Sequence, residues 1–158
     1  MAEAQPRQDE IFFEFFLEVG ILAQLSRAVF EARLPPGFNL PQFSVLNHLI
    51  RRGGGQTPLE LARTFQVPKT SMTHSLAVLD RHGLIEMRPN RRDGRSKCVF
   101  VTAAGRAFRD TALAAITPDV DALSARFAAA RVAEALPTLS ALREVMDAMR
   151  DPGGENDG

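Results

Sequence analysis

The chain has 158 residues, 45% hydrophobic and 24% charged, with 19 basic and 19 acidic side chains that give a formal net charge of zero. This length and composition suit one compact domain and exclude a disordered chain. The single cysteine, Cys98, excludes an intrachain disulfide and argues against a cysteine-based zinc site.

The N-terminal region carries no targeting or membrane signal. It lacks the basic start, apolar run and small-residue cleavage site of a signal peptide. Glu14 and Glu18 interrupt its apolar stretch, which stays below the roughly 18 residues of a transmembrane helix. We therefore expect a soluble, cytoplasmic protein with no membrane partner.

The neutral total hides a segregation of charge. Residues 41–106 hold 11 basic and four acidic side chains, a net charge of +7, and the rest of the chain carries −7. A neutral chain argues mildly against nucleic acid as a partner, but a basic middle between acidic ends predicts a module that binds a polyanion. The alternative is a basic surface that only faces solvent.

Residues 9–33 are strongly apolar, and their apolar side chains nearly encircle a helical wheel. A helix that is apolar on most sides is buried on most sides. In so short a chain, this pattern predicts a helix buried against a second subunit. A Pro-Pro-Gly stretch at 35–37 ends it.

Two capping patterns mark the next helices: Asn-Leu-Pro-Gln at 39–42 and Thr-Pro-Leu-Glu at 57–60. The helix that begins at 39–42 ends at the glycines 53–55. The helix that begins at 57–60 is short, and a further helix runs over about 68–82. Two helices joined by a tight turn form a helix-turn-helix unit. We expect a small core between these two helices, made by Leu59, Ala62, Val67, Met72, Leu76 and Leu79. The helix before them has one core face, made by Phe43, Leu46, Leu49 and Ile50.

The stretches 84–88 and 98–102 predict two strands joined by a polar, basic tip. A helix-turn-helix followed at once by a basic hairpin is a winged helix. Thr102 suits the cap of a further helix over about 103–128, in which Pro118 is expected to make a kink or a break.

The last stretch, about 131–150, has a heptad-like seam that Pro137 is expected to bend or restart. Its members are Ala135, Leu139, Leu142, Met146 and Met149.

These elements predict a mainly α fold with a small β-hairpin wing, in which a winged helix-turn-helix is joined to an α-helical dimerisation layer. We expect an N-terminal dimerisation helix in 1–40, the DNA-binding module in 41–106, C-terminal dimerisation helices in 107–150 and a disordered tail in 151–158. Residues 1–8 are also expected to be disordered.

The helix predicted over about 68–82 has the properties of a recognition helix. Its inward face carries Met72, Leu76 and Leu79, so the opposite face presents Thr70, His74, Ala77 and Arg81, flanked by Ser71, Thr73 and Val78. Small hydrogen-bonding groups suit the major groove, and Lys69 beside free helix amides suits a phosphate. The alternative is a merely solvent-exposed face, although such faces more often carry Glu and Lys.

The wing tip concentrates Arg91, Arg92, Arg95 and Lys97 within seven residues, a charge that fits the narrowed minor groove of A·T-rich DNA. Asp93 is placed to orient the Arg95 guanidinium through a short turn, and a plain Asp-Gly turn is a compatible alternative. The predicted DNA-binding residues are Lys69, Thr70, Ser71, Thr73, His74, Arg81, Arg88, Arg91, Arg92, Asp93, Arg95 and Lys97.

The stretch 40–105 resembles the MarR family of bacterial transcriptional regulators. The family's wing pattern is D-x-R followed, several residues later, by L-T-x-x-G. It is matched here by Asp93, Arg95, Val101 in the leucine position, Thr102 and Gly105. Residues 79–85 also resemble the family's approach to the wing, and the likeness spans nearly the whole chain once the helical ends are included.

The resemblance implies a homodimer with interleaved first and last helices that presents two winged helices to a pseudo-palindromic operator in double-stranded DNA. It implies that Arg95 enters the minor groove and that Asp93 orients it. Many members release DNA when a small, often aromatic or phenolic, anion binds between the dimerisation layer and the DNA-binding lobes. His74 stands where members often have arginine, which alters the expected base preference. Cys98 lies in a wing strand, whereas the peroxide-sensing branch has its cysteine near the N-terminus.

We therefore predict a sequence-specific regulator, a repressor released by a small aromatic anion, that has no cofactor, no metal and no catalytic site. An enzyme would need converging ligands or a nucleophile with a base. His48 is interpreted as a helix-face residue, with a place in a ligand cleft as the alternative; no ligand-binding residues are assigned. The alternative function is architectural DNA binding or protein interaction without an effector, and four cations at the wing tip argue against a protein-binding wing.

Overall fold

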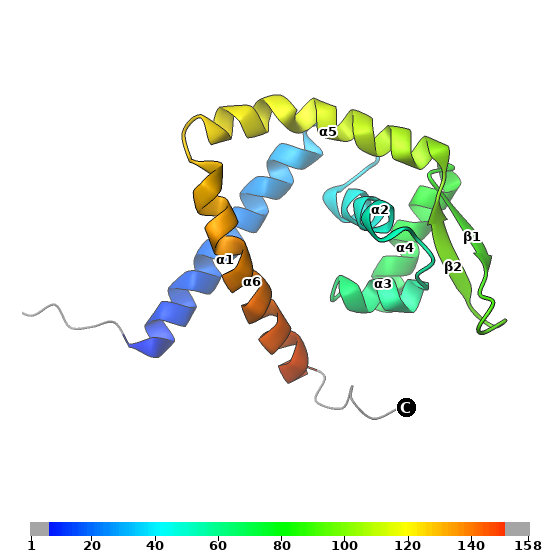
Figure 1. Ribbon diagram of the computed structural model, residues 1–158, viewed down its shortest axis with the longest axis horizontal. Coiled ribbons are helices and arrows are strands. Elements are labelled where there is room, and N and C mark those ends of the chain that lie inside the picture. Colours follow the sequence, from blue (N-terminus) through cyan, green and yellow to red (C-terminus); the bar gives the residue numbers. More distant parts are fainter. Residues whose placement is uncertain (1–6, 151–158) are drawn as a thin grey trace, which may run out of the picture. The chain divides into compact units, whose positions relative to one another are not determined.

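A computed structural model describes residues 7–150 (Figure 1). Its elements in chain order are α1 Gln8–Glu31, α2 Leu40–Arg52, α3 Pro58–Thr64, α4 Lys69–Arg81, β1 Ile85–Pro89, β2 Lys97–Val101, α5 Ala103–Ser124 and α6 Ala129–Arg150. The expected class, mainly α with one β-hairpin, is confirmed.

The chain divides into two compact units, Met1–Thr117 and Pro118–Gly158. The predicted domain boundaries at residues 40 and 106 stay a prediction. The disorder expected for 1–6 and 151–158 falls outside the described residues. At residues 7 and 8 that expectation is wrong, because α1 begins at Gln8 and the Arg7 backbone N–H donates to the Glu10 carboxylate over 3.1 Å.

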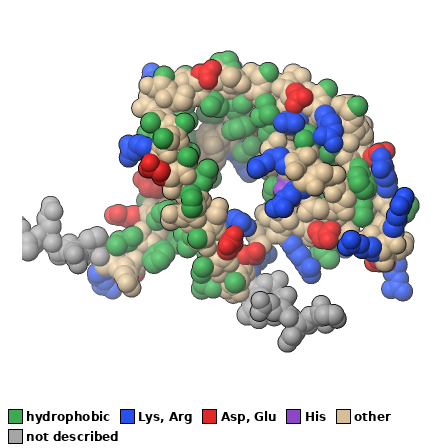
Figure 2. Space-filling model, in the orientation of Figure 1, with side chains coloured by type: hydrophobic (Ala, Val, Ile, Leu, Met, Phe, Trp, Pro, Cys, Tyr) green, Lys and Arg blue, Asp and Glu red, His purple; other side chains and the backbone are tan. Residues whose placement is uncertain are grey.

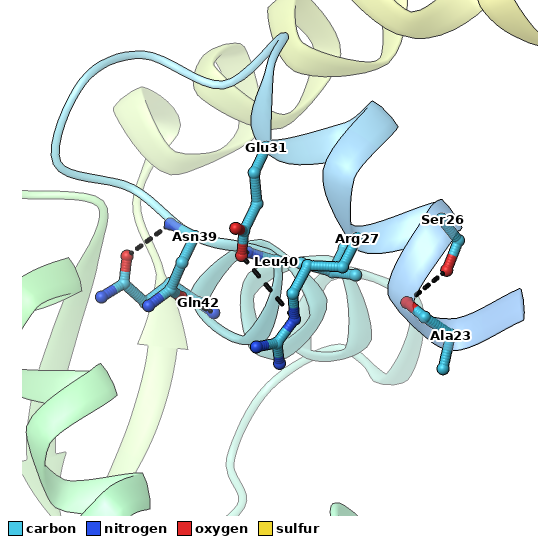
Figure 3. A network of polar contacts seen from close by, with 7 residues as sticks. All are labelled: Ala23, Ser26, Arg27, Glu31, Asn39, Leu40 and Gln42. Carbon is cyan, nitrogen blue, oxygen red and sulfur yellow. Dashed lines mark hydrogen bonds and ion pairs between the residues drawn. The ribbon is translucent and has the colours of Figure 1, made fainter. Parts of the chain in front are cut away.

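The capping patterns form as expected. The Asn39 side chain accepts from the Gln42 N–H at 3.0 Å, and the Gln42 side chain accepts from the Asn39 N–H at 3.1 Å (Figure 3). Thr57 and Glu60 make the same reciprocal pair at the start of α3. Each pair satisfies two amides that the first helical turn leaves without a partner, so these sequences fix where α2 and α3 begin.

The C-terminal end of α1 is fastened to the start of α2. The Leu40 N–H donates to the Glu31 carboxylate over 2.9 Å, and Arg27 reaches the same oxygen at 4.0 Å (Figure 3). The Phe30 and Phe43 rings lie 6.1 Å apart across the same junction. No residue of α1 is buried, so the helix is held at this end while its apolar side chains remain exposed.

The core of the winged helix lies between α2, α3, α4 and the hairpin. Leu46, Leu49 and Leu61 are fully buried in it. Two expectations are wrong. Leu59 is 46% exposed and Leu61 takes its place, because residues two apart on a helix point about 200° apart. Val78 is buried, so the exposed face of α4 is narrower than the sequence predicts.

β1 and β2 pair antiparallel, with Ile85 opposite Val101 and Pro89 opposite Lys97. Both strands lie one residue from their predicted positions. A further segment flanks β2 on its other edge, where Gln56 pairs with Val99. This segment follows the three glycines 53–55, all at positive φ, and a Cβ at Gly54 would lie 3.1 Å from the Phe100 ring. The glycine run thus lets the chain turn from α2 directly onto the wing.

α5 starts at a tight junction with the base of the wing. The Thr102 hydroxyl donates to the Gly83 carbonyl at 2.6 Å and accepts from the Gly105 N–H at 3.0 Å. A Cβ on Gly105 would lie 2.0 Å from the Leu84 carbonyl oxygen. Glycine is therefore needed here for the close approach of two backbones.

Of the outcomes expected at the two prolines, the break at Pro118 and the restart at Pro137 are wrong, and the kink and the bend stay predictions. Each proline lies inside an unbroken helix, α5 or α6. A proline removes one N–H donor, so each of these helices continues through the loss of one hydrogen bond. Described by itself, α6 has no buried residue and exposes Leu139, Met146 and Met149 of the predicted seam. No helix within residues 7–150 is long and apolar enough to cross a membrane.

Candidate nucleic-acid interface

The N-terminal half of α4 presents the predicted recognition residues to solvent. Lys69, Thr70, Ser71, Thr73 and His74 are all exposed. The residue before the helix is Pro68, which gives the first amides no side-chain cap. Free amides at a helix start attract an anion, and Lys69 adds a full positive charge beside them. The start of α4 is therefore suited to a phosphate.

The hydroxyls on α4 are not equivalent. Thr73 donates its hydroxyl proton to the Lys69 carbonyl at 2.9 Å, so its oxygen is left as an acceptor. His74 lies on the same exposed face and offers a ring nitrogen, one helical turn from Thr70. Arg81 is exposed at the far end of α4. Hydrogen-bonding groups thus cluster at the start of the helix, while the charge of Arg81 stands apart from them.

The wing tip, residues 90–96, is closed by its own hydrogen bonds. The Asn90 and Ser96 side chains meet at 2.8 Å, and the Asn90 N–H donates to the Ser96 carbonyl at 3.0 Å. The Arg92 N–H donates to the Asn90 side chain at 3.0 Å. A short loop with this many internal bonds holds its backbone in one conformation.

Asp93 acts on the backbone of the tip. Its carboxylate accepts from the Arg95 backbone N–H at 3.0 Å, and its carbonyl accepts from the Ser96 N–H at 3.1 Å. This is the Asp-Gly turn that the sequence offered as one of two compatible interpretations. Within the described chain, no ion pair joins this carboxylate to the Arg95 guanidinium, which is exposed together with those of Arg91 and Arg92.

Arg88 differs from the tip arginines. Its guanidinium pairs with Glu86 and lies 4.6 Å from the centre of the Phe100 ring, on the outer face of the hairpin. Cys98, half-buried, lies directly opposite Arg88 in the ladder. Lys97 is exposed at the base of the tip. Of the predicted basic residues, Arg88 is thus held by partners within the wing, whereas those of the tip project into solvent.

Figure 2 shows Lys and Arg side chains gathered over the wing, at the right of the view. α4 packs against β1, so the recognition face and the hairpin belong to one packed module. The start of α4 and the wing tip are thus carried by the same module. Within residues 7–150, no group of three or more His, Cys, Asp or Glu side chains is placed to hold a metal ion.

A cavity of about 660 Å³ lies along the exposed side of α2. Its apolar wall comes from Phe30, Phe43 and Phe65, and its polar lining includes Arg51 and Arg52. His48 lines it as well, and the alternative that this histidine belongs to a ligand cleft stays a prediction. Aromatic walls beside two guanidiniums suit a small aromatic anion.

Sequence reasoning missed three residues that shape the wing: Gln56, Asn90 and Ser96. The polar tip signalled a turn, but the pairing of Asn90 with Ser96 depends on the hairpin register. Gln56 contacts His48 and Val99, which are far from it in sequence, so no local pattern could reveal its role.

Comparisons with known proteins give one family match and several similar solved structures. Residues 37–96 match the family model described as the MarR family. No match was found among curated proteins.

Similar solved structures cover most of this chain. A mutant MarR from E. coli complexed with operator DNA is 23% identical, with a TM-score of 0.70 over 87% of this chain and 99% of that one. BldR from Sulfolobus solfataricus is 17% identical, with a TM-score of 0.74 over 86% and 99%. PcaV from Streptomyces coelicolor, in complex with its natural ligand, is 19% identical, with a TM-score of 0.65 over 94% and 99%.

Proposed function

We propose that this chain, whose residues 37–96 match the MarR family model, is a transcriptional regulator of that family and binds operator DNA. The observation that carries the proposal is the internally bonded wing tip with its exposed arginines, on the same module as the uncapped, polar start of α4. The mutant MarR from E. coli, whose structure is similar, is complexed with operator DNA, and this supports the same partner here.

The two parts of the module have separate tasks. α4 enters the major groove, where Thr70, Ser71 and His74 reach base edges and Lys69 meets a phosphate. The wing follows the neighbouring backbone, and Arg95 enters the minor groove. Asp93 fixes the backbone from which Arg95 projects, and the long side chain is free to find its position on DNA.

Replacing Arg95 by alanine tests this assignment. The loss of one guanidinium from the minor groove should weaken operator binding by about 1–3 kcal/mol. It should also make the slope of log affinity against log salt concentration less steep, by the contribution of one phosphate contact. Affinity is measured by fluorescence anisotropy at fixed salt, on a duplex that the full chain selects from random DNA. Arg143→Ala, on the exposed surface of α6, is the matched control and should bind as the unchanged chain does. Equal affinities for the two variants would contradict the wing assignment.

Replacing His74 by alanine should change which operators are preferred. The imidazole is placed to contact a base edge, so its loss should lower affinity for the selected duplex more than for duplexes altered at the contacted position, by about 1–3 kcal/mol. Binding to a panel of single-base variants measures this. A uniform weakening across the panel would argue for a phosphate contact instead.

We also propose that the regulator is a homodimer. Within its own compact unit, the described part of α1 exposes an apolar surface, in which Leu17, Leu22 and Leu25 are each about 60% exposed. α6 exposes apolar side chains of its own, including Met146 and Met149. Exposed apolar surface of this extent marks an interface, and a second copy of the chain supplies matching surface. Two copies then present two winged helices to a pseudo-palindromic operator.

The finer proposal is a repressor released by a small aromatic anion that binds in the cavity along α2. The phenylalanines provide ring contacts, and Arg51 provides a charged hydrogen-bond donor. PcaV, a similar structure, was solved with its natural ligand, which supports a ligand-responsive protein.

Benzoate is a suitable first probe of this cavity. It should bind the full chain and lower its operator affinity, and Arg51→Met should weaken benzoate binding about tenfold or more, because a charged partner is lost. Isothermal titration measures the binding, with Arg143→Met as the control. If Arg51→Met and the control bind benzoate equally, the proposed site is wrong.

A further inference from the structure

His48 and Gln56 form a side-chain contact between α2 and the wing. The His48 Nε2 and Gln56 Oε1 atoms lie 2.8 Å apart, and both residues are half-buried. Gln56 Oε1 is an acceptor, so Nε2 carries the proton and donates it. The His48 ring also meets the Phe65 ring edge to face, with centroids 5.4 Å apart. The imidazole is therefore held on two sides, and it fixes the Gln56 amide.

Gln56 is at the same time part of the wing's sheet. Its carbonyl accepts from the Val99 N–H at 2.9 Å, and the Gly55 N–H donates to the Val99 carbonyl at 2.8 Å. Val99 is fully buried in the middle of β2, and β2 leads directly to the tip. Gln56 thus contacts α2 through its side chain, and through its backbone it contacts Val99, the central residue of β2.

The backbone between α2 and Gln56 has no side chains that could link it to α2. It consists of three glycines at positive φ, which have no side chains to anchor them. Gly54 donates its N–H to the Leu49 carbonyl at 2.9 Å. The Gly53 N–H donates to the same carbonyl, so backbone bonds hold the start of the segment to α2. Because glycine backbones are the most easily rearranged, the His48 contact adds the side-chain link that fixes Gln56 relative to α2.

We infer that Gln56 is a positioning residue for DNA binding: held by His48, it sets the angle at which the wing projects from the helices. This inference rests on the proposed function, since it acts through the arginines of the tip. A wing whose strand edge is loosened presents Arg91, Arg92 and Arg95 over a wider range of positions, and fewer of these positions match the groove.

The variants are chosen to remove the contact from either side. Gln56→Met keeps the length of the side chain and removes the acceptor, whereas His48→Leu removes the donor and His48→Gln keeps one. Gln8→Met, at the exposed start of α1, is the matched control. All are made in the full chain, and their melting temperatures are compared first.

The first measurement does not require DNA. Hydrogen exchange followed by mass spectrometry reports the protection of amides in 90–101. Gln56→Met and His48→Leu should each exchange several-fold faster in this stretch than the unchanged chain, while His48→Gln and Gln8→Met should not. Unchanged exchange in both contact-breaking variants would overturn the inference, whatever the protein binds.

The second measurement asks whether the effect passes through the tip. On a selected duplex, Gln56→Met should lower affinity about three- to tenfold, the range of one lost hydrogen bond. In a background where Arg91, Arg92 and Arg95 are all alanine, Gln56→Met should lower the logarithm of the affinity by less than about half as much. Equal fold-losses in both backgrounds would show that Gln56 acts elsewhere. If no duplex is selected, the proposed function fails, and the exchange result still decides whether Gln56 positions the wing.

Discussion

Gly105→Ala should destabilise the winged helix by about 3 kcal/mol, the upper end of the usual cost of overpacking a well-packed site. The added Cβ would lie 2.0 Å from the Leu84 carbonyl oxygen and 2.7 Å from a methyl of Val101. The nearer atom belongs to the backbone, so no side-chain rotation can relieve the contact. The start of α5 has to move away from Leu84, and the bonds of Thr102 to Gly83 and Gly105 are strained or lost.

Urea denaturation followed by circular dichroism measures this loss. Gly20→Ala is the matched control, because Gly20 lies inside α1 with nothing within 4 Å of the added Cβ. There the substitution should leave stability unchanged or raise it by up to about 1 kcal/mol, since alanine favours a helix over glycine. A Gly105→Ala variant as stable as the unchanged chain would show that the two backbones do not approach as described.

Leu22→Glu should convert the proposed dimer to a monomer and lower operator affinity by about a hundredfold or more. A carboxylate at this position would lie in the apolar interface without a partner, a cost of several kcal/mol for each copy. Each winged helix would then bind its half-site alone and lose the gain from linking two binding events. Sedimentation at micromolar concentration and anisotropy on the selected duplex measure the two effects.

Gln8→Glu adds the same charge at the exposed first residue of α1, outside the apolar stretch of the helix, and should remain dimeric with nearly unchanged affinity. Circular dichroism should show that both variants keep their helices, because the core of the winged helix does not include α1. A dimer that tolerates Leu22→Glu would place the interface elsewhere. An unchanged chain that sediments only as a monomer would contradict the dimer itself.

Features that depend on local chemistry were predictable from the sequence. The caps at Asn39 and Thr57 and the glycine stop at Gly53 follow from patterns a few residues long, and each forms as expected. The wing followed from two apolar stretches around a polar, basic loop. For the candidate site, the same patterns placed the start of α4 and the tip arginines on exposed surface.

Features that depend on distant partners were not predictable. Leu59 was expected in the core because it is an apolar residue of a predicted helix. In the short helix α3, however, only one face packs against the core, and Leu61 lies on that face while Leu59 is exposed. Pro118 does not break α5, because the cost of one lost hydrogen bond is smaller than the stability of the rest of the helix. The contact between His48 and Gln56 joins residues on separate elements, so it became visible only in the fold.

Sequence-selective DNA binding by the winged helix is the central claim, and one titration tests it most directly. Duplexes are selected from random DNA by the full chain, and the affinity of the best duplex is compared with that of a scrambled duplex of equal composition across a range of salt concentrations. The selected duplex should bind about a thousandfold tighter, and both affinities should fall steeply with salt as counterions are released. Equal affinity for the two duplexes at every salt concentration would contradict the account.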